Sequence, residues 1–193
     1  SSVDLMERAA ICCSDEIAKF TDEKDHICIL CGPGNNGGDG LAIARILADA
    51  GKNVSVLLTD NSNKLSPDAE ANFLRLQKTS VKIFYLTDAN LPFKNTTFWV
   101  DAIFGTGLNK AVEKNIADLI HQVNSTRTPV ISIDLPSGLF ADKHTPTNVA
   151  VIHASTTLTF QRLKRSMLYA ENAHRIGEVK VLDIGLDEHY MES

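Results

Sequence analysis

Hydrophobic positions recur along the chain with two alternating periods. Apolar residues three or four positions apart predict amphipathic helices over residues 2–20, 38–50, 67–79 and 112–124. Short runs that are apolar throughout predict buried strands at residues 26–31, 54–58, 81–86, 98–100 and 130–133. The last third of the chain offers further strand candidates at residues 149–152, 156–160 and 178–182. Because strands that alternate with helices form βαβ units, the pattern predicts an α/β fold with a mostly parallel sheet.

The composition places these elements in one folded domain. A length of 193 residues suits a single domain, and 44% hydrophobic with 22% charged residues excludes a disordered chain. No apolar run reaches the roughly 18 residues of a membrane span, and the first residues lack the pattern of a signal peptide. The net charge of −5 disfavours a nucleic acid or an anionic membrane as partner. Because the chain starts at Ser1 and not at Met, we expect a processed chain or a piece of a longer one.

Two of the four cysteines, Cys28 and Cys31, form a C-x-x-C motif. Such a motif is typical of redox or metal sites. Here it lies inside a predicted strand, where residues i and i+3 point to opposite faces, so the two thiols cannot hold one ion. We therefore expect buried structural cysteines, and free buried thiols favour a reducing compartment such as the cytoplasm.

The segment after the first predicted strand carries the strongest local signal. Residues 32–40 contain five glycines, satisfy G-x-G-x-x-G and precede a predicted helix, a pattern typical of phosphate binding. Asp60, at the end of the second predicted strand, is a candidate for an acidic partner of a ribose. A tight turn without a ligand is the alternative interpretation of the glycines. Asn35, Asn36 and Asp39 exceed what phosphate binding requires and indicate polar recognition or ion ligation.

Two further predicted strands end in an aspartate that is followed by a turn. Asp101 precedes a Gly-rich turn, and Asp134 precedes Pro136, Ser137 and Gly138. In an open parallel sheet, ligands bind outside the carboxyl ends of the strands, so these groups are expected at one edge with residues 32–40. Their oxygen-rich set suits a hard cation, whereas an aspartate that only caps its loop is the alternative.

A nucleophilic triad of Ser137, Asp134 and a histidine is a competing interpretation. It is disfavoured because the chain lacks a G-x-S-x-G elbow and no histidine can be assigned a place beside Ser137.

At these segments the sequence resembles the YjeF N-terminal domain family, the NAD(P)H-hydrate epimerases. The resemblance rests on four segments that span most of the chain in the expected order: residues 5–9 (LMERA), 32–40, 100–108 and 132–138, with a weaker match from 157 to 185. It implies a Rossmann-like three-layer αβα sandwich that forms a single domain over residues 1–193. The implied substrate is hydrated NADH or NADPH, with a hydroxyl on C6 of the nicotinamide ring. The implied reaction interconverts its R and S forms, so that a dehydratase that acts only on S can repair both.

The resemblance also implies a set of site residues. The substrate contacts carried over are Asn35, Asn36, Gly37, Gly38, Asp39, Gly105, Thr106, Gly107, Leu108, Asn109, Lys110, Ala111 and Asp134. A potassium ion is implied at Asn36, Asp101 and Ser137. We hypothesise that Asp134 is the general acid and base, because either epimerisation route moves protons to and from oxygen. A carboxylate that only orients the ribose or the loop is the alternative role for Asp134.

Some features depart from the family pattern or extend beyond this domain. Residues 161–168 are more basic than the Gly/Pro-rich pattern expected there, although Lys164 matches the family lysine. The resemblance implies a homodimer and a dehydratase as functional partner, which many bacteria fuse to this domain. Residues 186–193 are interpreted as a tail or the start of a linker. A non-catalytic scaffold module and an ordinary NAD(P) oxidoreductase are the alternative functions.

Overall fold

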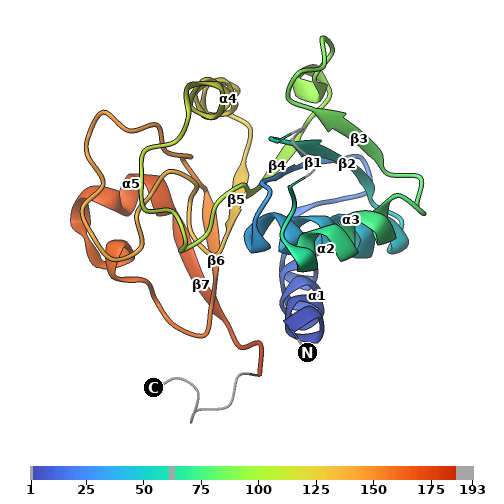
Figure 1. Ribbon diagram of the computed structural model, residues 1–193, viewed down its shortest axis with the longest axis horizontal. Coiled ribbons are helices and arrows are strands. Elements are labelled where there is room, and N and C mark those ends of the chain that lie inside the picture. The colour runs from blue at the N-terminus through green and yellow to red at the C-terminus, as the bar shows by residue number, and fades with distance from the viewer. Residues whose placement is uncertain (1, 61–63, 186–193) are drawn as a thin grey trace.

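Seven parallel strands form the central layer of the part of the chain that the structure, a computed structural model, describes: residues 2–60 and 64–185 (Figure 1). Their spatial order is β3-β2-β1-β4-β5-β6-β7, and every neighbouring pair is parallel. The strands are β1 (His26–Cys31), β2 (Asn53–Leu58), β3 (Lys82–Tyr85), β4 (Phe98–Ala102), β5 (Val130–Ile133), β6 (Thr156–Phe160) and β7 (Glu178–Leu182). The predicted α/β class is confirmed, and the sheet is parallel throughout.

Helices cover both faces of this sheet and complete a three-layer sandwich. One face packs against α1 (Ser2–Phe20), α2 (Asn35–Asp49) and α3 (Pro67–Leu76), and the other against α4 (Lys114–Ser125) (Figure 1). The short α5 (Ala173–Ile176) precedes β7. Two apolar cores result, and Cys31 belongs to the first whereas Cys28 belongs to the second. The C-x-x-C thiols therefore point to opposite faces of the sheet, as predicted, and both are free.

Local signals explain where two of the helices begin and end. Ser66 caps α3 by accepting a hydrogen bond from the Ala69 N–H at 3.4 Å, and Pro67 occupies the first turn. After α2, Gly51 adopts a φ of 80°, a left-handed conformation that ends helices and favours glycine.

Two predictions from the sequence were wrong. Residues 149–152 do not form a strand, because the Ile152 N–H donates to the Ser137 carbonyl across a loop and not to a neighbouring strand. The helix predicted from residue 38 begins at Asn35, so residues 35–40, two thirds of the glycine-rich segment 32–40, are helical. The structure also contains short 3-10 turns at 92–94, 165–168 and 170–172 that the hydrophobic pattern does not indicate.

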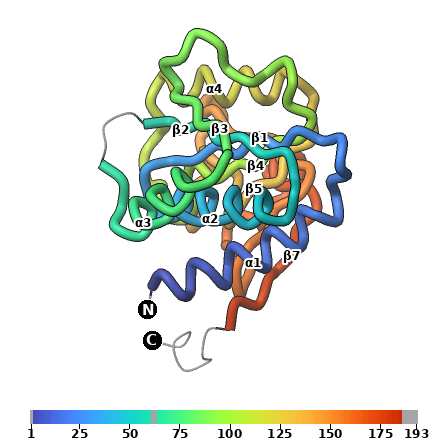
Figure 2. Tube along the Cα trace, turned by 90° about the vertical axis from the view of Figure 1, so that its right-hand side faces the viewer, coloured from blue at the N-terminus to red at the C-terminus, as the bar shows by residue number. Residues whose placement is uncertain are grey.

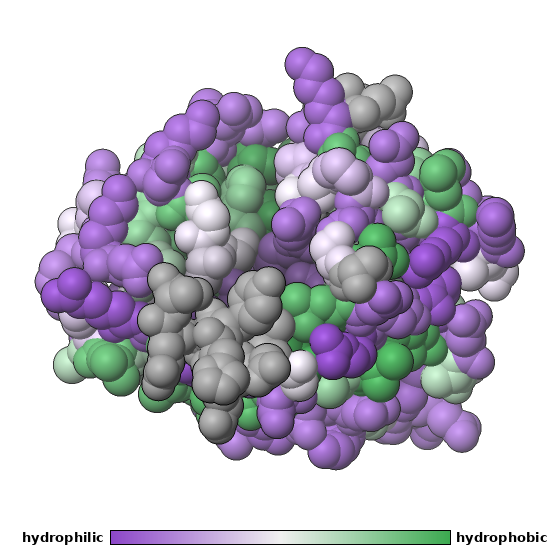
Figure 3. Space-filling model, turned by 60° about the horizontal axis from the view of Figure 1, so that its bottom comes forward, coloured by the Kyte–Doolittle hydropathy of each residue, from purple (hydrophilic) through white to green (hydrophobic). Residues whose placement is uncertain are grey.

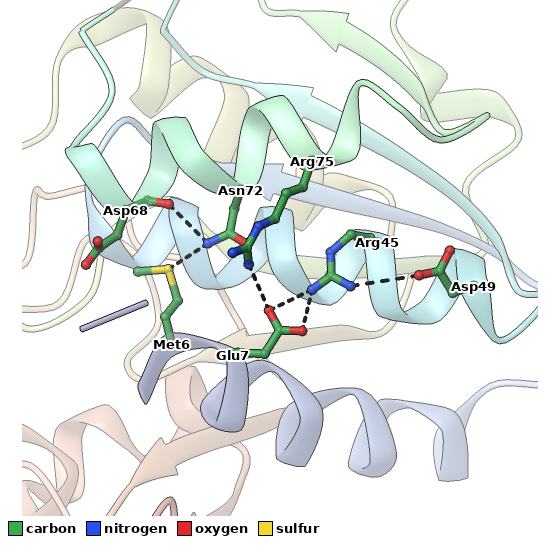
Figure 4. Close-up of polar contacts among 7 residues, drawn as sticks. All are labelled: Met6, Glu7, Arg45, Asp49, Asp68, Asn72 and Arg75. Atoms are coloured by element: carbon green, nitrogen blue, oxygen red, sulfur yellow. Dashed lines mark hydrogen bonds and ion pairs between the residues drawn. The ribbon is translucent and has the colours of Figure 1, made fainter. Parts of the chain in front are cut away.

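The N-terminal helix is fastened to α2 and α3 by one polar network (Figure 4). Arg45 donates to both carboxylate oxygens of Glu7, at 2.5 and 2.7 Å, and Arg75 approaches the same carboxylate at 3.5 Å. Asn72 donates to the Met6 sulfur at 3.1 Å. A Cβ added at Gly38 would lie 2.9 Å from that sulfur, so Met6 packs directly on the first turns of α2. The network thus holds the start of α2 in place.

The same helix also reaches the last strand of the sheet. Figure 2 shows α1 and β7 side by side, although they lie at opposite ends of the sequence. Lys180 on β7 pairs with Glu16 at 3.1 Å, and Arg8 donates to the Gly185 carbonyl at 3.3 Å. α1 therefore connects the two halves of the sheet.

The face of the molecule drawn in Figure 3 is mainly polar. Hydrophilic residues cover most of the face in Figure 3, and hydrophobic side chains form separate patches on it. Within residues 2–60 and 64–185, no helix combines the length and the apolar character needed to cross a bilayer.

Candidate functional site

The strand order reverses between β1 and β4, and a cavity opens at that point. Chain segments leaving β1, β4 and β5 emerge side by side there, which is the arrangement that the sequence predicted. The cavity has a volume of about 620 Å³, within the range of roughly 300–1,000 Å³ that is usual for ligand sites.

Glycines allow the first two of these segments to interlock. A Cβ at Gly32 would lie 2.0 Å from the Ile103 carbonyl oxygen, and a Cβ at Gly37 would lie 1.8 Å from the Gly32 oxygen. Neither position tolerates a side chain, because backbone atoms fill the space on both sides. The glycine signal in the sequence therefore reflects a close approach of backbone to backbone as well as a possible ligand contact.

The amino end of α2 faces the cavity without a side-chain cap. Gly34 is the capping residue and has no side chain to cap the first N–H groups, and Gly34, Asn35 and Asn36 all line the cavity. The first N–H groups of a helix have no partner within it and carry a partial positive charge. The geometry therefore suits an anionic ligand group such as phosphate.

Most of the substrate-binding residues implied by the resemblance surround this one cavity. Those that line it are Asn35, Asn36, Asp39, Gly105, Thr106, Gly107, Leu108, Asn109, Lys110 and Asp134. Gly37 and Gly38 do not line it, because they are buried against Gly32 and Met6. Ala111 lines a smaller neighbouring cavity.

Asp134 holds its carboxylate at the cavity in an unusual backbone conformation. Its φ is 65°, a left-handed value that is costly for a residue with a Cβ, and the residue is 9% exposed. The Asp134 N–H is anchored on the Leu158 carbonyl at 2.7 Å, and the Thr106 N–H donates to Oδ2 at 3.2 Å. Strain of this kind at a cavity is typical of a functional side chain.

The partner of Asp134 is Lys164, to which the sequence analysis gave no role. Its Nζ lies 3.0 Å from the Asp134 Oδ1, and the two side chains are only 15% and 13% exposed. The ammonium also donates to the Phe160 carbonyl at 3.1 Å, which fixes its position. The sequence signals for Lys164 were its match to the family lysine and its place after the strand predicted at residues 156–160. The structure places that strand, β6, beside β5.

Asp101 is a different kind of carboxylate, because it is fully buried and its described partners are all neutral. Its Oδ2 accepts hydrogen bonds from the Ser132 hydroxyl and the Ser137 N–H, both at 2.8 Å, and its Oδ1 accepts from the Ser137 hydroxyl at 2.5 Å. Burial raises the pKa of Asp101, and the hydrogen bonds from Ser137 and Ser132 oppose that rise. A buried carboxylate with hydroxyl neighbours fits a hard cation.

Asn36, the third expected potassium ligand, has an unsatisfied side chain. Its Nδ2 is buried without a hydrogen-bond partner, and the side chain lies against Gly105, where an added Cβ would be 3.4 Å from its Oδ1. Asp101 and Ser137 are in direct contact, whereas the hydrogen bonds of the described residues do not join Asn36 to them. An orphaned buried amide of this kind points to a missing partner.

Asp39 is a second carboxylate at the same cavity. Burial, and after it the charges of Asp134 and Asp68, raises the pKa of Asp39 to about 8. Asp39 is therefore mainly protonated at neutral pH and acts as a hydrogen-bond donor to a ligand or to a neighbour.

The alternative nucleophilic triad is wrong. The Ser137 hydroxyl donates to Asp101, and Asp134 pairs with Lys164. In the described part of the chain no histidine forms a hydrogen bond with Ser137 or with Asp134, so Ser137 has no base to activate it.

Comparisons with known proteins show the family to which this chain belongs. Residues 2–166 match the family model described as "YjeF-related protein N-terminus". An NAD(P)H-hydrate epimerase of Weissella koreensis is 35% identical over 187 residues, which is 96% of this chain and 82% of the relative. An enzyme of the same name from Limosilactobacillus fermentum is 36% identical, and the match covers 94% of this chain and 86% of the relative.

Two further matches are to a longer protein and to a solved structure. The "Bifunctional NAD(P)H-hydrate repair enzyme Nnr" of Salinibacter ruber is 35% identical to 96% of this chain, but the match covers only 37% of that protein. The crystal structure of the yeast protein YNL200c superposes with a TM-score of 0.77 at 24% identity over 93% of this chain and 77% of its own, which shows a shared fold. On the length of the family match and the identity to its relatives, this chain belongs to the YjeF-related protein N-terminus family.

Proposed function

We propose that this protein interconverts the R and S epimers of hydrated NADH and NADPH at C6 of the nicotinamide ring. The observation that carries the proposal is the Asp134–Lys164 pair, which a strained backbone holds at the cavity of a chain whose curated relatives are named NAD(P)H-hydrate epimerases. The open amino end of α2 supports it, because a dinucleotide brings a diphosphate to such a position.

The chemistry requires proton transfer and charge balance without oxidation or reduction. C6 of the hydrate carries a hydroxyl beside the ring nitrogen. As the C6–oxygen bond breaks, the nitrogen lone pair forms a C=N bond, and the departing oxygen takes a proton to become water. Water then adds from the other face and returns one proton. Ring opening and reclosure is the alternative route with the same overall balance. A carboxylate that can give and accept this proton at oxygen is the central requirement of both routes.

Asp134 is the proposed acid and base, and Lys164 is its positioning partner. Thr106 N–H and the Lys164 ammonium each hold one oxygen of the Asp134 carboxylate, at 3.2 and 3.0 Å, so its orientation is fixed before substrate binds. Asp39, which is mainly protonated at neutral pH, lies along the same cavity and offers a hydrogen bond to substrate oxygen.

Asn36, Asp101 and Ser137 form the proposed potassium site. The Asn36 amide oxygen, beside Gly105, and the wholly buried Asp101 carboxylate are ligands that a hard cation prefers. The unpaired Asn36 Nδ2 is a donor and would be left for an acceptor on the substrate. When bound, the ion would supply a fixed positive charge that attracts the anionic diphosphate. The residues themselves order the turn after β4, because Ser137 accepts a hydrogen bond from the Phe104 N–H at 2.9 Å.

The proposal extends to the partners and the compartment. The Salinibacter ruber relative is named a bifunctional repair enzyme, which supports a dehydratase as the functional partner of this domain. A homodimer and a cytoplasmic location complete the proposal, the latter supported by free thiols at Cys13, Cys28 and Cys31 that are fully buried.

A coupled assay tests the function. Purified R-hydrate is incubated with a dehydratase that acts only on the S form, and the return of NADH is followed by absorbance. The wild-type protein should accelerate recovery of the R form, and Lys164→Met should lower kcat by about 30-fold, because Asp134 loses its positioning partner. Lys180→Met, which removes a lysine from β7, is the matched control and should keep wild-type turnover. A wild-type protein that leaves recovery of the R form unchanged would overturn the proposed function.

A further inference from the structure

A smaller cavity adjoins the site on the side of β2. Its volume is about 220 Å³, and it shares Pro33, Phe104, Leu108 and Lys110 with the larger cavity. The shared walls make the two cavities neighbouring compartments of one cleft. Alone, the smaller one is below the size of a usual ligand site, so it suits one end of a longer ligand.

The walls of this second compartment are apolar on one side and polar on the other. Phe104, Leu108 and Ile116 provide flat or branched apolar surface, which suits the faces of a purine ring. Thr59 and Asp60 lie on the polar side, directly after β2 ends at Leu58. The same side also carries Lys110, Glu113 and Asn115, so two carboxylates face the compartment against one ammonium. The Thr59 N–H and hydroxyl both contact the Cys31 carbonyl, at 3.0 and 3.2 Å, and this fixes the segment that carries Asp60 beside the end of β1.

The order of the compartments matches the layout of a bound dinucleotide. Pro33 lines both cavities, and the open amino end of α2 at Gly34 follows it at once. A diphosphate at that helix would therefore separate an adenosine near Asp60 from a nicotinamide near Asp134. In doubly wound sheets, a carboxylate at the end of the second strand accepts hydrogen bonds from the ribose hydroxyls of NAD, and it repels the 2′-phosphate of NADP.

From this arrangement we infer that Asp60 binds the 2′-hydroxyl of the adenosine ribose and makes the hydrated NADH the preferred substrate over the hydrated NADPH. The inference rests on the proposed function for its substrate, but it concerns the opposite end of the ligand. A negative side chain beside a 2′-phosphate is unfavourable, and the Thr59 contacts with the Cys31 carbonyl hold the residue before Asp60 at this wall.

Kinetics with both hydrates test this inference. The wild-type kcat/KM should be about tenfold higher for hydrated NADH than for hydrated NADPH, the discrimination expected from one charged hydrogen bond. Asp60→Asn should bring the two values within about twofold, because the amide keeps a hydrogen-bond acceptor and loses the charge. Asp118→Asn removes the same charge from the exposed surface of α4 and should leave the ratio unchanged. Equal wild-type values, or an unchanged ratio in Asp60→Asn, would overturn the inference.

A binding experiment separates this inference from the proposed function. ADP-ribose and its 2′-phosphate derivative lack the nicotinamide and report only on the adenosine end. Calorimetry should give the wild-type protein about tenfold tighter binding of ADP-ribose, and Asp60→Asn should abolish the difference. This result without epimerase activity would refute the function and support the subsite. Epimerase activity with equal binding of both probes would support the proposed function and refute the role of Asp60.

Discussion

The ends of β4 and β5 are indistinguishable in the sequence but differ sharply in the structure. Each is an apolar strand that ends in aspartate and enters a turn. Asp101 is 0% exposed, accepts hydrogen bonds at both oxygens and lies within its strand. Asp134 lies one residue beyond its strand, adopts a φ of 65° and faces the cavity with a lysine as partner.

The difference teaches how one motif serves two purposes. A carboxylate surrounded by hydroxyl and N–H donors ties neighbouring segments together, and it leaves no oxygen for a substrate. A carboxylate at a strained backbone position stays accessible, because the fold has to hold it there at a cost in free energy. We therefore expect changes at Asp101 to act on stability and changes at Asp134 to act on activity.

Replacement of Asp134 by Asn is the most severe test of this division. Asparagine has nearly the same shape and tolerates the left-handed backbone, so the fold should survive. Without the acid and base, kcat should fall about a thousandfold in the coupled assay with R-hydrate. The urea midpoint should stay close to that of the wild type. Near-normal turnover would show that Asp134 only orients the ligand, which was the alternative left open by the sequence.

Removal of the Asp101 carboxylate should have the second largest effect. Asp101→Ala leaves the Ser132 and Ser137 donors buried without an acceptor, which should lower the free energy of unfolding by about 3 kcal/mol. Urea denaturation at pH 7 measures this loss. Asp134→Ala is the matched change at the other strand end and should cost less. It leaves the Thr106 N–H without an acceptor, whereas the Lys164 ammonium keeps its hydrogen bond to the Phe160 carbonyl. Equal losses would remove the distinction between the two aspartates.

The sequence predicts most of the parallel sheet that positions Asp101 and Asp134. The strands are fully apolar runs in a parallel sheet, and their ends meet at one edge because the connections are helical. The position of Asp101 and Asp134 near a glycine-rich segment therefore followed from the pattern alone. What differs between them, burial and backbone strain, depends on neighbours from β6 and from the turn after β4, and such contacts leave no period in the sequence.

Lys164 and the start of α2 show why the rest could not be predicted. Lys164 lies in an irregular segment after β6, where no hydrophobic period reports a direction, so its ion pair with Asp134 appears only in three dimensions. Glycine is a poor helix former, so the pattern predicts the helix only from residue 38 and leaves residues 35–37 outside it. Packing overrides this propensity, because Gly37 fits against Gly32 and Gly38 against Met6, and both contacts require the helix to begin early.

The pKa of Asp39 depends in part on the charge of Asp134, so the pH dependence of stability offers a further, smaller test. Because the pKa of Asp39 is raised to about 8, the folded state keeps a proton that the unfolded state loses near pH 4. The free energy of unfolding of the wild type should therefore fall as the pH rises from about 4 to 8. Asp39→Asn removes this contribution, so its stability relative to the wild type should increase steadily as the pH rises from 5 to 8.

Urea denaturation of the wild type and of Asp39→Asn at pH 5, 6.5 and 8 measures how the difference between their free energies of unfolding changes with pH. In an Asp134→Asn background the divergence should shrink, because one of the charges that raise the pKa of Asp39 is gone. Wild-type and Asp39→Asn curves that stay parallel across this range would show that Asp39 is not protonated in the folded protein.

The smallest expected effect is the most direct test of the role given to Asp101. If Asp101, Asn36 and Ser137 hold potassium, the ion binds the folded state only and raises the free energy of unfolding by about 1 kcal/mol when its concentration is several times Kd. Thermal unfolding in potassium chloride is compared with choline chloride at equal ionic strength, which screens surface charges equally. Asp101→Asn keeps the shape of the side chain and should lose the potassium-specific increase, whereas Asp134→Asn should retain it. The same increase in choline, or its persistence in Asp101→Asn, would mean that the buried carboxylate at the end of β4 only ties the strands together and needs no ion.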